Sequence, residues 1–252
     1  MFLICWMTLR TRLLQSTLSK GKLYIIPVPI SEDTLEKVIP DFNKSVVKEL
    51  RFFVVEKLKT ARQFLRKMDA SFPIDDSVFF EQDKHAAYNF HPDVVTLLND
   101  GKDVGLLSES GYPGVADPGT KIVAIAHEQG CTVIPLIGPS SILLALAASG
   151  MNGQGFTFHG YLPKSGNDRV QKIKDLVTQI QRTGFAQLFI ETPYRNDVML
   201  DDLLKTVPAD LKLTIAYDIS GVSEKISTKK IGEWKKKPFD FDKLPCVFVL
   251  GN

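Results

Sequence analysis

Residues 104–119 read VGLLSESGYPGVADPG, a short apolar run followed by a loop rich in glycine and proline. The run 104–107 has the length and the continuous apolar character of a strand buried on both faces of a parallel sheet. The three Gly and two Pro of residues 108–119 fix the shape of the loop and allow a ligand to approach its backbone closely. Open α/β sheets bind ligands at the ends of such strands. The stretch therefore predicts a ligand loop on a parallel sheet.

Strand-like and helix-like segments alternate outward from this stretch. We expect strands over residues 22–28, 52–55, 77–81, 104–107 and 132–137, and helices over 58–68, 91–100, 121–129 and 140–149. Ser31, followed by two acidic residues, is predicted to cap a further helix. The second half predicts strands over 156–160, 186–191, 212–217 and 246–250, with helices over 170–180 and 196–205. The alternation indicates two α/β domains, 21–138 and 139–252, the first with a mostly parallel sheet covered by helices on both faces.

Composition excludes several classes of protein. Of 252 residues, 44% are hydrophobic and 24% charged, which is typical of a globular chain and not of a disordered one. The longest apolar run, Ile142 to Ala148, is too short to span a bilayer. The three cysteines form no ligand spacing, and no His/Cys/Asp set suits a metal. We therefore expect a cytoplasmic protein with reduced cysteines, no metal and no membrane segment.

The first 20 residues are expected to be a poorly ordered extension of the folded protein or an upstream start, with a targeting signal as the alternative. Their apolar part ends at Met7, before Arg10 and Arg12, whereas a secretory signal carries its positive charge first.

The net charge of +2 conceals two basic segments. Residues 57–67 hold five basic side chains and no acid, and residues 225–237 hold six lysines against one glutamate. Two interpretations stay open: solvated faces, or surfaces that contact the phosphates of RNA.

A second loop, Gly138-Pro139-Ser140-Ser141, opens the apolar helix and offers N–H groups and hydroxyls at its start. Neither this loop nor 108–119 matches the Walker A or G-x-G-x-x-G patterns. The alternative interpretation is two connecting loops, one of them with a capping serine.

Five motifs together resemble a known family. They are IPVPI at 26–30, LLSESGYPGVADPG at 106–119, PLIGPSS at 135–141, FHGYLPK at 158–164 and ETPYR at 191–195. In this order they resemble the tetrapyrrole methylase superfamily, most of all the branch that methylates a ribose 2′-hydroxyl in small-subunit ribosomal RNA. The resemblance implies a C-terminal mixed sheet, S-adenosylmethionine held in a cleft between the domains, and a homodimer.

The resemblance also implies cofactor-binding residues. The backbone of Ser110, Gly111 and Tyr112, with Val115, would line the methionine part of the cofactor. Ser140 and Ser141 would lie beside its carboxylate or sulfonium side. Pro29, Ile190 and Glu191 would border the same cleft.

This sequence departs from the family pattern at three places. Ser31-Glu32-Asp33 stands where Gly-Asn-Leu is usual, and Tyr112 stands where a small hydroxyl is usual. Glu56-Lys57-Leu58-Lys59 replaces the usual Glu-Asp-Thr-Arg. These departures are compatible with cofactor binding and leave the methyl acceptor open.

Methyl transfer from a sulfonium requires a positioned acceptor and the removal of its proton. Glu56 is the candidate base or orienting group, and Lys57 or Lys59 is the candidate cation; the other interpretation is a solvated acid beside helix-start lysines. Arg62, His85 and Asn89 are candidate substrate contacts.

Three functions follow from these observations. The first is an S-adenosylmethionine-dependent methyltransferase that modifies a ribose of small-subunit RNA. The second is the same chemistry on a tetrapyrrole or another small molecule. The third is a catalytically inactive paralogue that binds the cofactor, because of Tyr112 and the acid and hydroxyl missing beside Glu56.

Overall fold

The computed structural model of the protein describes residues 19–82 and 92–252, so the candidate residues His85 and Asn89 lie outside the described residues. The chain divides into two compact units: the chain up to Val28 together with Pro40–Ile137, and Pro29–Ile39 together with Gly138–Asn252. A single boundary at residue 138 would place residues 29–39 in the first domain, whereas they pack with the second unit. Each unit is described by itself.

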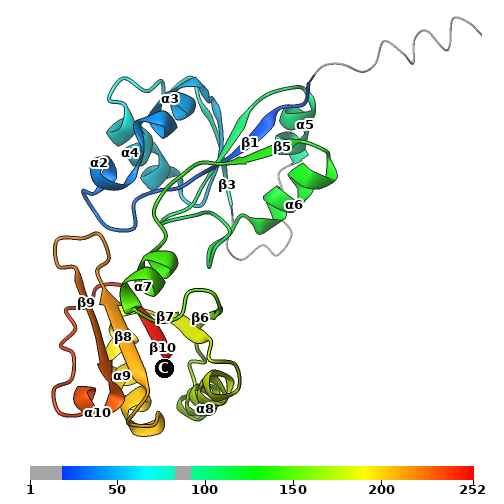
Figure 1. The fold of residues 1–252 in the computed structure, drawn as a ribbon. Helices are drawn as coiled ribbons and strands as arrows, with labels where there is room; N and C mark the ends of the chain where they lie inside the picture. The colour runs from blue at the N-terminus through cyan, green and yellow to red at the C-terminus, as the bar shows by residue number, and fades with distance from the viewer. Residues whose placement is uncertain (1–18, 83–91) are drawn as a thin grey trace, which may run out of the picture. The chain divides into compact units, whose positions relative to one another are not determined.

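The first unit contains a parallel sheet of five strands in the order β3-β2-β4-β1-β5. The strands are β1 (Lys22–Ile26), β2 (Phe52–Val55), β3 (Val78–Glu81), β4 (Val104–Leu107) and β5 (Thr132–Pro135) (Figure 1). The expected parallel sheet is confirmed. After β1 the chain continues to β2, toward one edge of the sheet. After the neighbouring β4 it continues to β5, at the opposite edge. The β4–β1 pair is therefore a topological switch point, where sheets of this kind bind ligands.

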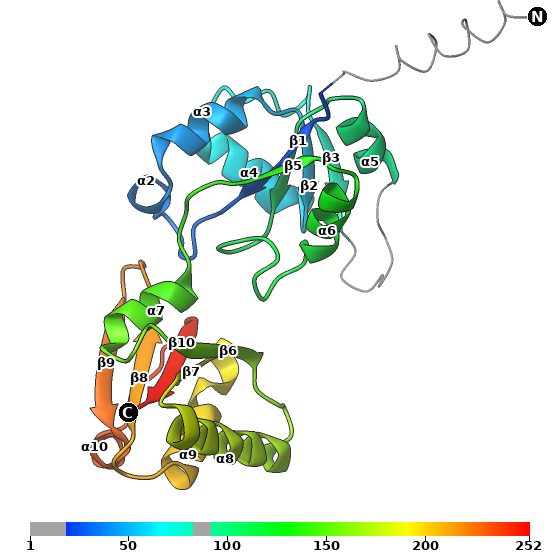
Figure 2. The same cartoon turned by 45° about the vertical axis from the view of Figure 1, so that its right-hand side comes forward.

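Helices cover both faces of this sheet (Figures 1 and 2). On one face lie α3 (Asp41–Glu49) and α4 (Leu58–Met68), and on the other lie α5 (Pro92–Asn99) and α6 (Thr120–Glu128). The expected apolar stripe of α4 is buried, with Ala61 at 6% and Leu65 at 0% exposure. Helix α3 has no counterpart in the sequence prediction.

The second unit contains a mixed sheet in the order β6-β7-β10-β8-β9. The strands are β6 (Phe156–Tyr161), β7 (Ala186–Glu191), β8 (Lys212–Tyr217), β9 (Lys225–Lys230) and β10 (Cys246–Gly251). Only the β6–β7 pair is parallel, so the expected mixed sheet is confirmed. Strand β9 lies in the second basic segment, where the sequence predicted no strand. Lysines on an edge strand discourage pairing with other chains.

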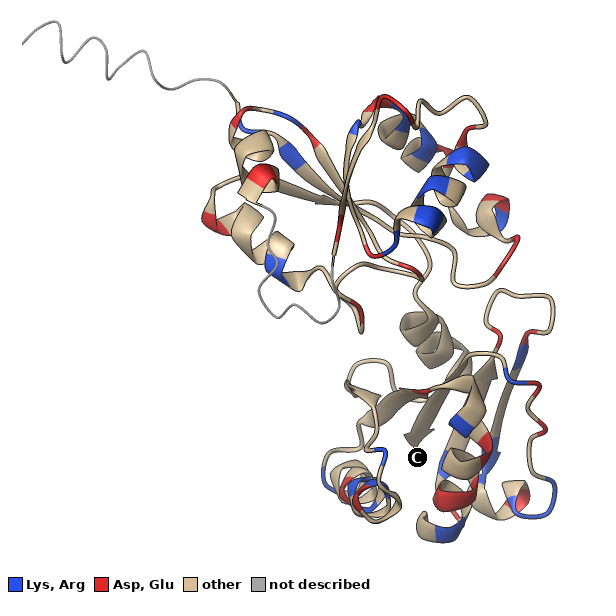
Figure 3. Ribbon diagram, turned by 180° about the vertical axis from the view of Figure 1, so that it is seen from behind, with Lys and Arg blue, Asp and Glu red and all other residues tan. Residues whose placement is uncertain are grey.

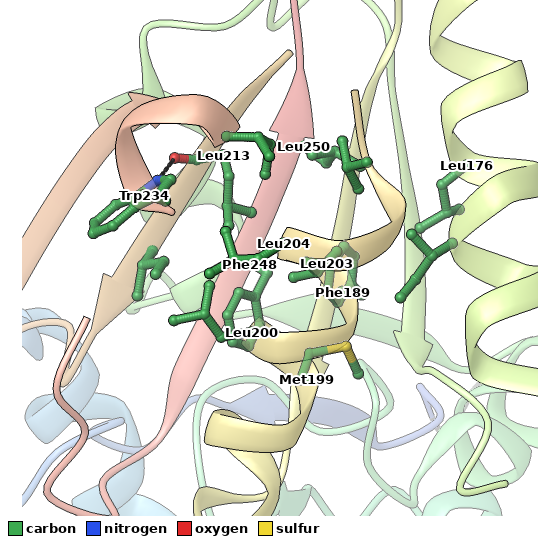
Figure 4. Close-up of a cluster of buried hydrophobic side chains, with 14 of the residues drawn as sticks. Leu176, Phe189, Met199, Leu200, Leu203, Leu204, Leu213, Trp234, Phe248 and Leu250 are labelled. Carbon is green, nitrogen blue, oxygen red and sulfur yellow. Dashed lines mark hydrogen bonds between the residues drawn. The ribbon is translucent and has the colours of Figure 1, made fainter. Parts of the chain in front are cut away.

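Helix α7 (Ser141–Ser149) covers one face of this sheet, and α8 (Gly166–Thr183), α9 (Asn196–Thr206) and α10 (Ile231–Trp234) line the other. Figure 4 shows the larger core, in which Phe189 and Phe248 stack at 5.4 Å and the indole N–H of Trp234 donates to the carbonyl of Leu213 at 2.9 Å. The guanidinium of Arg169 on α8 contacts the carboxylate of Asp202 on α9 at 2.6 and 2.7 Å. None of the helices in the described residues is long and apolar enough to cross a membrane.

Residues 29–39 carry the short helix α2 (Leu35–Val38), and its N-cap residue is Thr34. The prediction of Ser31 as a helix cap is wrong. Its hydroxyl lies instead 3.1 Å from the carboxylate of Asp218 and 3.0 Å from the carbonyl of Ile219. The Nζ of Lys37 donates to the carbonyl of Ser220 at 3.1 Å. These long-range bonds hold the segment in the second unit and outweigh the local capping signal.

Candidate functional site

The loop 108–119 follows β4 at the switch point of the parallel sheet and is anchored to the segment after β1. Val28 and Gly111 exchange two backbone hydrogen bonds, of 2.9 and 3.2 Å. The loop closes on itself where the N–H of Gly114 donates to the carbonyl of Pro118 at 3.0 Å. Gly119, with a φ of +130°, ends the loop as the N-cap residue of α6. The backbone of the loop is thus held in one shape.

Tyr112 has a structural partner inside the first unit. Its hydroxyl donates to the carbonyl of Leu136 at 3.0 Å, so the side chain joins the β4 loop to the segment after β5. Ser110 is exposed, and Val115 is 49% exposed. The accessible side of the loop therefore offers backbone polar groups and a small apolar surface. This chemistry fits the amino-acid part of S-adenosylmethionine, which needs hydrogen-bonding partners beside an apolar chain.

The end of β2 brings together two of the candidate catalytic residues. Glu56 is 5% exposed, whereas Lys57 lies on the surface. The Nζ of Lys57 contacts the carboxylate of Glu109 at 2.8 Å, and the hydroxyl of Thr60 donates to the same carboxylate. The hydrogen bond and charge of Glu109 raise the pKa of Lys57. Both effects favour the protonated, cationic form of Lys57.

An open pocket of about 600 Å³ lies beside the start of α4. It is lined by Lys57, Leu58, Lys59, Arg62, Gln63 and Glu81. The pocket thus gathers three of the four described residues predicted for catalysis or substrate contact, and Glu56 is not among its lining residues. The guanidinium of Arg62 lies over the ring of Phe79 at 5.4 Å, which orients this cation at the pocket.

The other predicted cofactor residues belong to the second unit. The hydroxyl of Ser140 accepts from the N–H of Leu143 at 3.4 Å and so caps α7, which begins at Ser141. Ile190 packs against the smaller core of this unit. Glu191 is fully buried at its side chain, pairs with Arg195 at 2.8 Å and accepts from the N–H of Thr192 at 2.7 Å. Its charge is therefore compensated within its own unit.

Sequence reasoning missed the loop after β8. Two of its residues other than glycine, Asp218 and Ser220, have φ values of +46° and +67°. The carboxylate of Asp218 accepts from the N–H of Ser223 at 2.9 Å, and Glu224 accepts from the N–H of Ser220 at 2.6 Å. The Asp-Ile-Ser-Gly composition signals a turn, but no sequence pattern reveals these backbone angles. Backbone angles of this kind cost about 1–3 kcal/mol per residue.

The residues that the structure describes contain no cluster of three or more His, Cys, Asp or Glu side chains arranged to hold a metal ion.

Comparison with known proteins identifies the family. The model of the Tetrapyrrole (Corrin/Porphyrin) Methylases matches residues 34–235. The chain is 28% identical over 213 residues to a protein of Vibrio cholerae serotype O1 named Ribosomal RNA small subunit methyltransferase I, covering 84% of this chain and 69% of the relative. A protein of the same name from Halalkalibacterium halodurans is 28% identical over 238 residues, covering 92% and 77%. A third, from Neisseria meningitidis serogroup B, is 31% identical over 140 residues, covering 56% and 46%.

The family model spans most of the chain and includes the 108–119 loop, the start of α4 and the motifs of the second unit. The chain belongs to the Tetrapyrrole (Corrin/Porphyrin) Methylases.

Proposed function

We propose that the protein is an S-adenosylmethionine-dependent methyltransferase whose acceptor is ribosomal RNA of the small subunit. The observation that carries the proposal is the family match over residues 34–235, together with the names of the relatives reported above. The position of the loop 108–119 at the switch point of a parallel sheet supports it, because ligands bind there.

The proposed cofactor contacts in the first unit are Ser110, Gly111, Tyr112 and Val115. Support comes from the fixed shape of the loop and from the hydrogen bond that holds the Tyr112 side chain toward Leu136. The proposed contacts in the second unit are Pro29, Ser140, Ser141, Ile190 and Glu191. The ion pair of Glu191 with Arg195 favours a role for its backbone in preference to its carboxylate.

The cofactor would supply an electrophilic methyl group on its sulfonium. With a ribose 2′-hydroxyl as acceptor, transfer would form a bond from the hydroxyl oxygen to the methyl carbon and would break the bond from that carbon to sulfur. The hydroxyl proton must leave, and Glu56 is the proposed acceptor of it. Lys57 or Lys59 would stabilise the developing negative charge.

A tetrapyrrole or another small molecule is the second candidate acceptor. The cationic lining of the α4 pocket suits macrocycle carboxylates as well as phosphates. The names of the relatives favour RNA. We further propose a cytoplasmic homodimer; light scattering on a size-exclusion column tests the dimer.

The test begins with calorimetric titration of the full-length protein with S-adenosylmethionine. Transfer of labelled methyl groups to small-subunit RNA, to a tetrapyrrole and to total RNA follows. Methylation of the small-subunit RNA is expected, and Glu56→Gln should lower kcat while cofactor affinity stays unchanged.

Each alternative has its own result. Absence of cofactor binding would overturn the methyltransferase assignment. Transfer to the tetrapyrrole alone would replace the acceptor. Cofactor binding without transfer to any acceptor would indicate the inactive paralogue.

A further inference from the structure

We infer that the pocket at the start of α4 is a subsite for a phosphodiester of the RNA, continued along α4 by Arg66. The inference rests on the proposed function and names the part of the acceptor that this surface holds. It is carried by the pocket, its charges and the spacing of cations along the helix.

The pocket has the charge that an anion needs. Lys57, Lys59 and Arg62 contribute to its lining, and Glu81 is the one acidic residue in that lining. Glu109 balances Lys57 through their 2.8 Å contact, and the backbone N–H of Leu58 takes up one carboxylate oxygen of Glu81 at 3.3 Å. Lys59 and Arg62 therefore provide the positive charge directed toward a ligand.

Arg62 is held against an aromatic ring beside the pocket. Its guanidinium lies over the ring of Phe79 at 5.4 Å, and Phe79 in turn stacks on the buried Phe53 at 5.5 Å. A guanidinium held in this way loses less rotamer freedom when it binds, and its planar fork matches two phosphate oxygens. Lys59, one turn before it, supplies a mobile point charge.

The cationic row continues beyond the pocket. Lys59, Arg62 and Arg66 follow at intervals of three and four residues on α4, so they share one face of the helix. At a rise of 1.5 Å per residue, the row from Lys59 to Arg66 extends over about 10 Å. In Figure 3 the ribbon of α4, on the right of that view, carries several blue positions. A chain of phosphates along a single strand could contact the whole row.

The salt dependence of RNA binding tests whether the cations of this row contact phosphates. For single strands, the slope of log K against log salt changes by about 0.7 for each phosphate contact. Fluorescence anisotropy with a labelled 20-residue oligouridylate between 50 and 200 mM KCl should give a slope shallower by about 0.7 for Arg62→Gln and for Lys59→Gln. Between 50 and 200 mM KCl, the factor by which affinity falls is then about 2.6 times smaller for each variant than for the wild type.

Three further variants are measured in the same assay. Arg62→Lys keeps the charge and should keep the wild-type slope. Arg66→Gln should also flatten the slope, which a pocket-only ligand does not predict. Arg182→Gln removes an exposed arginine of α8 in the second unit and should leave slope and affinity unchanged. Calorimetric melting confirms that each variant is folded.

The inference is overturned if the slopes of Arg62→Gln, Lys59→Gln and Arg66→Gln equal that of the wild type, or if the wild type binds the oligouridylate without salt dependence. It is also overturned if a polycarboxylate macrocycle binds and only this binding is lost in Arg62→Gln. Methyl transfer by the wild type to small-subunit RNA, measured in parallel, keeps the proposed function separate. If the wild type methylates RNA and the variants keep its salt-dependence slope, only the phosphate subsite is rejected. If the wild type binds the cofactor but transfers no methyl group to RNA, the proposed acceptor is rejected.

Discussion

Substitution of Gly119 by alanine tests whether the shape of the 108–119 loop depends on this residue. Gly119 has a φ of +130°, a region that side-chain-bearing residues rarely occupy, and the cost there is about 1–3 kcal/mol. An added Cβ would lie 3.2 Å from Cδ2 of Leu106 and 3.3 Å from the backbone nitrogen of Gly114. Leu106 is fully buried, and that nitrogen is engaged with Pro118, so neither neighbour moves freely. We therefore expect Gly119→Ala to lower the free energy of unfolding by about 3 kcal/mol, the upper end of this range.

Differential scanning calorimetry measures this loss. For a chain of this size, about 3 kcal/mol corresponds to a Tm lower by about 6–12 °C. Titration of the folded variant with S-adenosylmethionine should also show weaker binding, because the loop backbone can no longer keep its shape.

Two other glycines provide matched controls. Gly130 also has a positive φ, +69°, but an added Cβ would meet no atom within 4 Å. Gly130→Ala should therefore cost about 1–2 kcal/mol, from backbone conformation alone. Gly153 has no positive φ and equally open surroundings, so Gly153→Ala should be close to neutral. A Gly119→Ala variant that melts no lower than Gly130→Ala would refute the steric part of the reasoning.

The remaining predictions concern side chains. Tyr112→Phe removes the hydrogen bond to Leu136 and should cost about 1 kcal/mol in urea denaturation; a change within error would mean that the bond is not formed in solution. Arg169→Met leaves the carboxylate of Asp202 without its buried partner and should cost about 3–5 kcal/mol, whereas a loss below 1 kcal/mol would contradict the contact. Burial lowers the pKa of His159, so the unfolded chain binds the proton more readily than the folded one. The contribution of His159 to the free energy of unfolding is complete above its pKa in the unfolded chain, about 6.5. This contribution declines as the pH falls toward the lower pKa that His159 has in the folded protein. The wild type should therefore lose more stability than His159→Gln between pH 7 and 5, and equal losses would show that His159 does not contribute.

The sequence predicted the first sheet because parallel strands buried on both faces appear as continuous apolar runs. Residues 52–55 and 104–107 are such runs, and both form central strands. Strand β9 could not be predicted in this way. Its KISTKK sequence indicates a charged surface, and the strand forms because its backbone pairs with β8. This pairing with the preceding strand leaves no apolar periodicity in the KISTKK sequence itself.

Part of the candidate site followed from spacing. Lys59 and Arg62 are three residues apart, so a helix places them on one face, and both line the pocket. The contact of Lys57 with Glu109 joins residues 52 positions apart, and that of Ser31 with Asp218 joins residues 187 positions apart. No local pattern encodes either contact, and the first of them raises the pKa of Lys57. The functional roles of these residues remain predictions.

The placement of residues 29–39 in the second unit means that the chain passes between the units at 28–29, 39–40 and 137–138. No single cut in the polypeptide therefore releases two intact halves. A fragment that ends at residue 137 retains Ser31 and Lys37 but loses Asp218 and Ser220, to which they bond. The two units of such a chain cannot be exchanged independently by a simple gene fusion. A recombinant that combines halves of two relatives at residue 138 would have to carry residues 29–39 from the parent that supplies its second half.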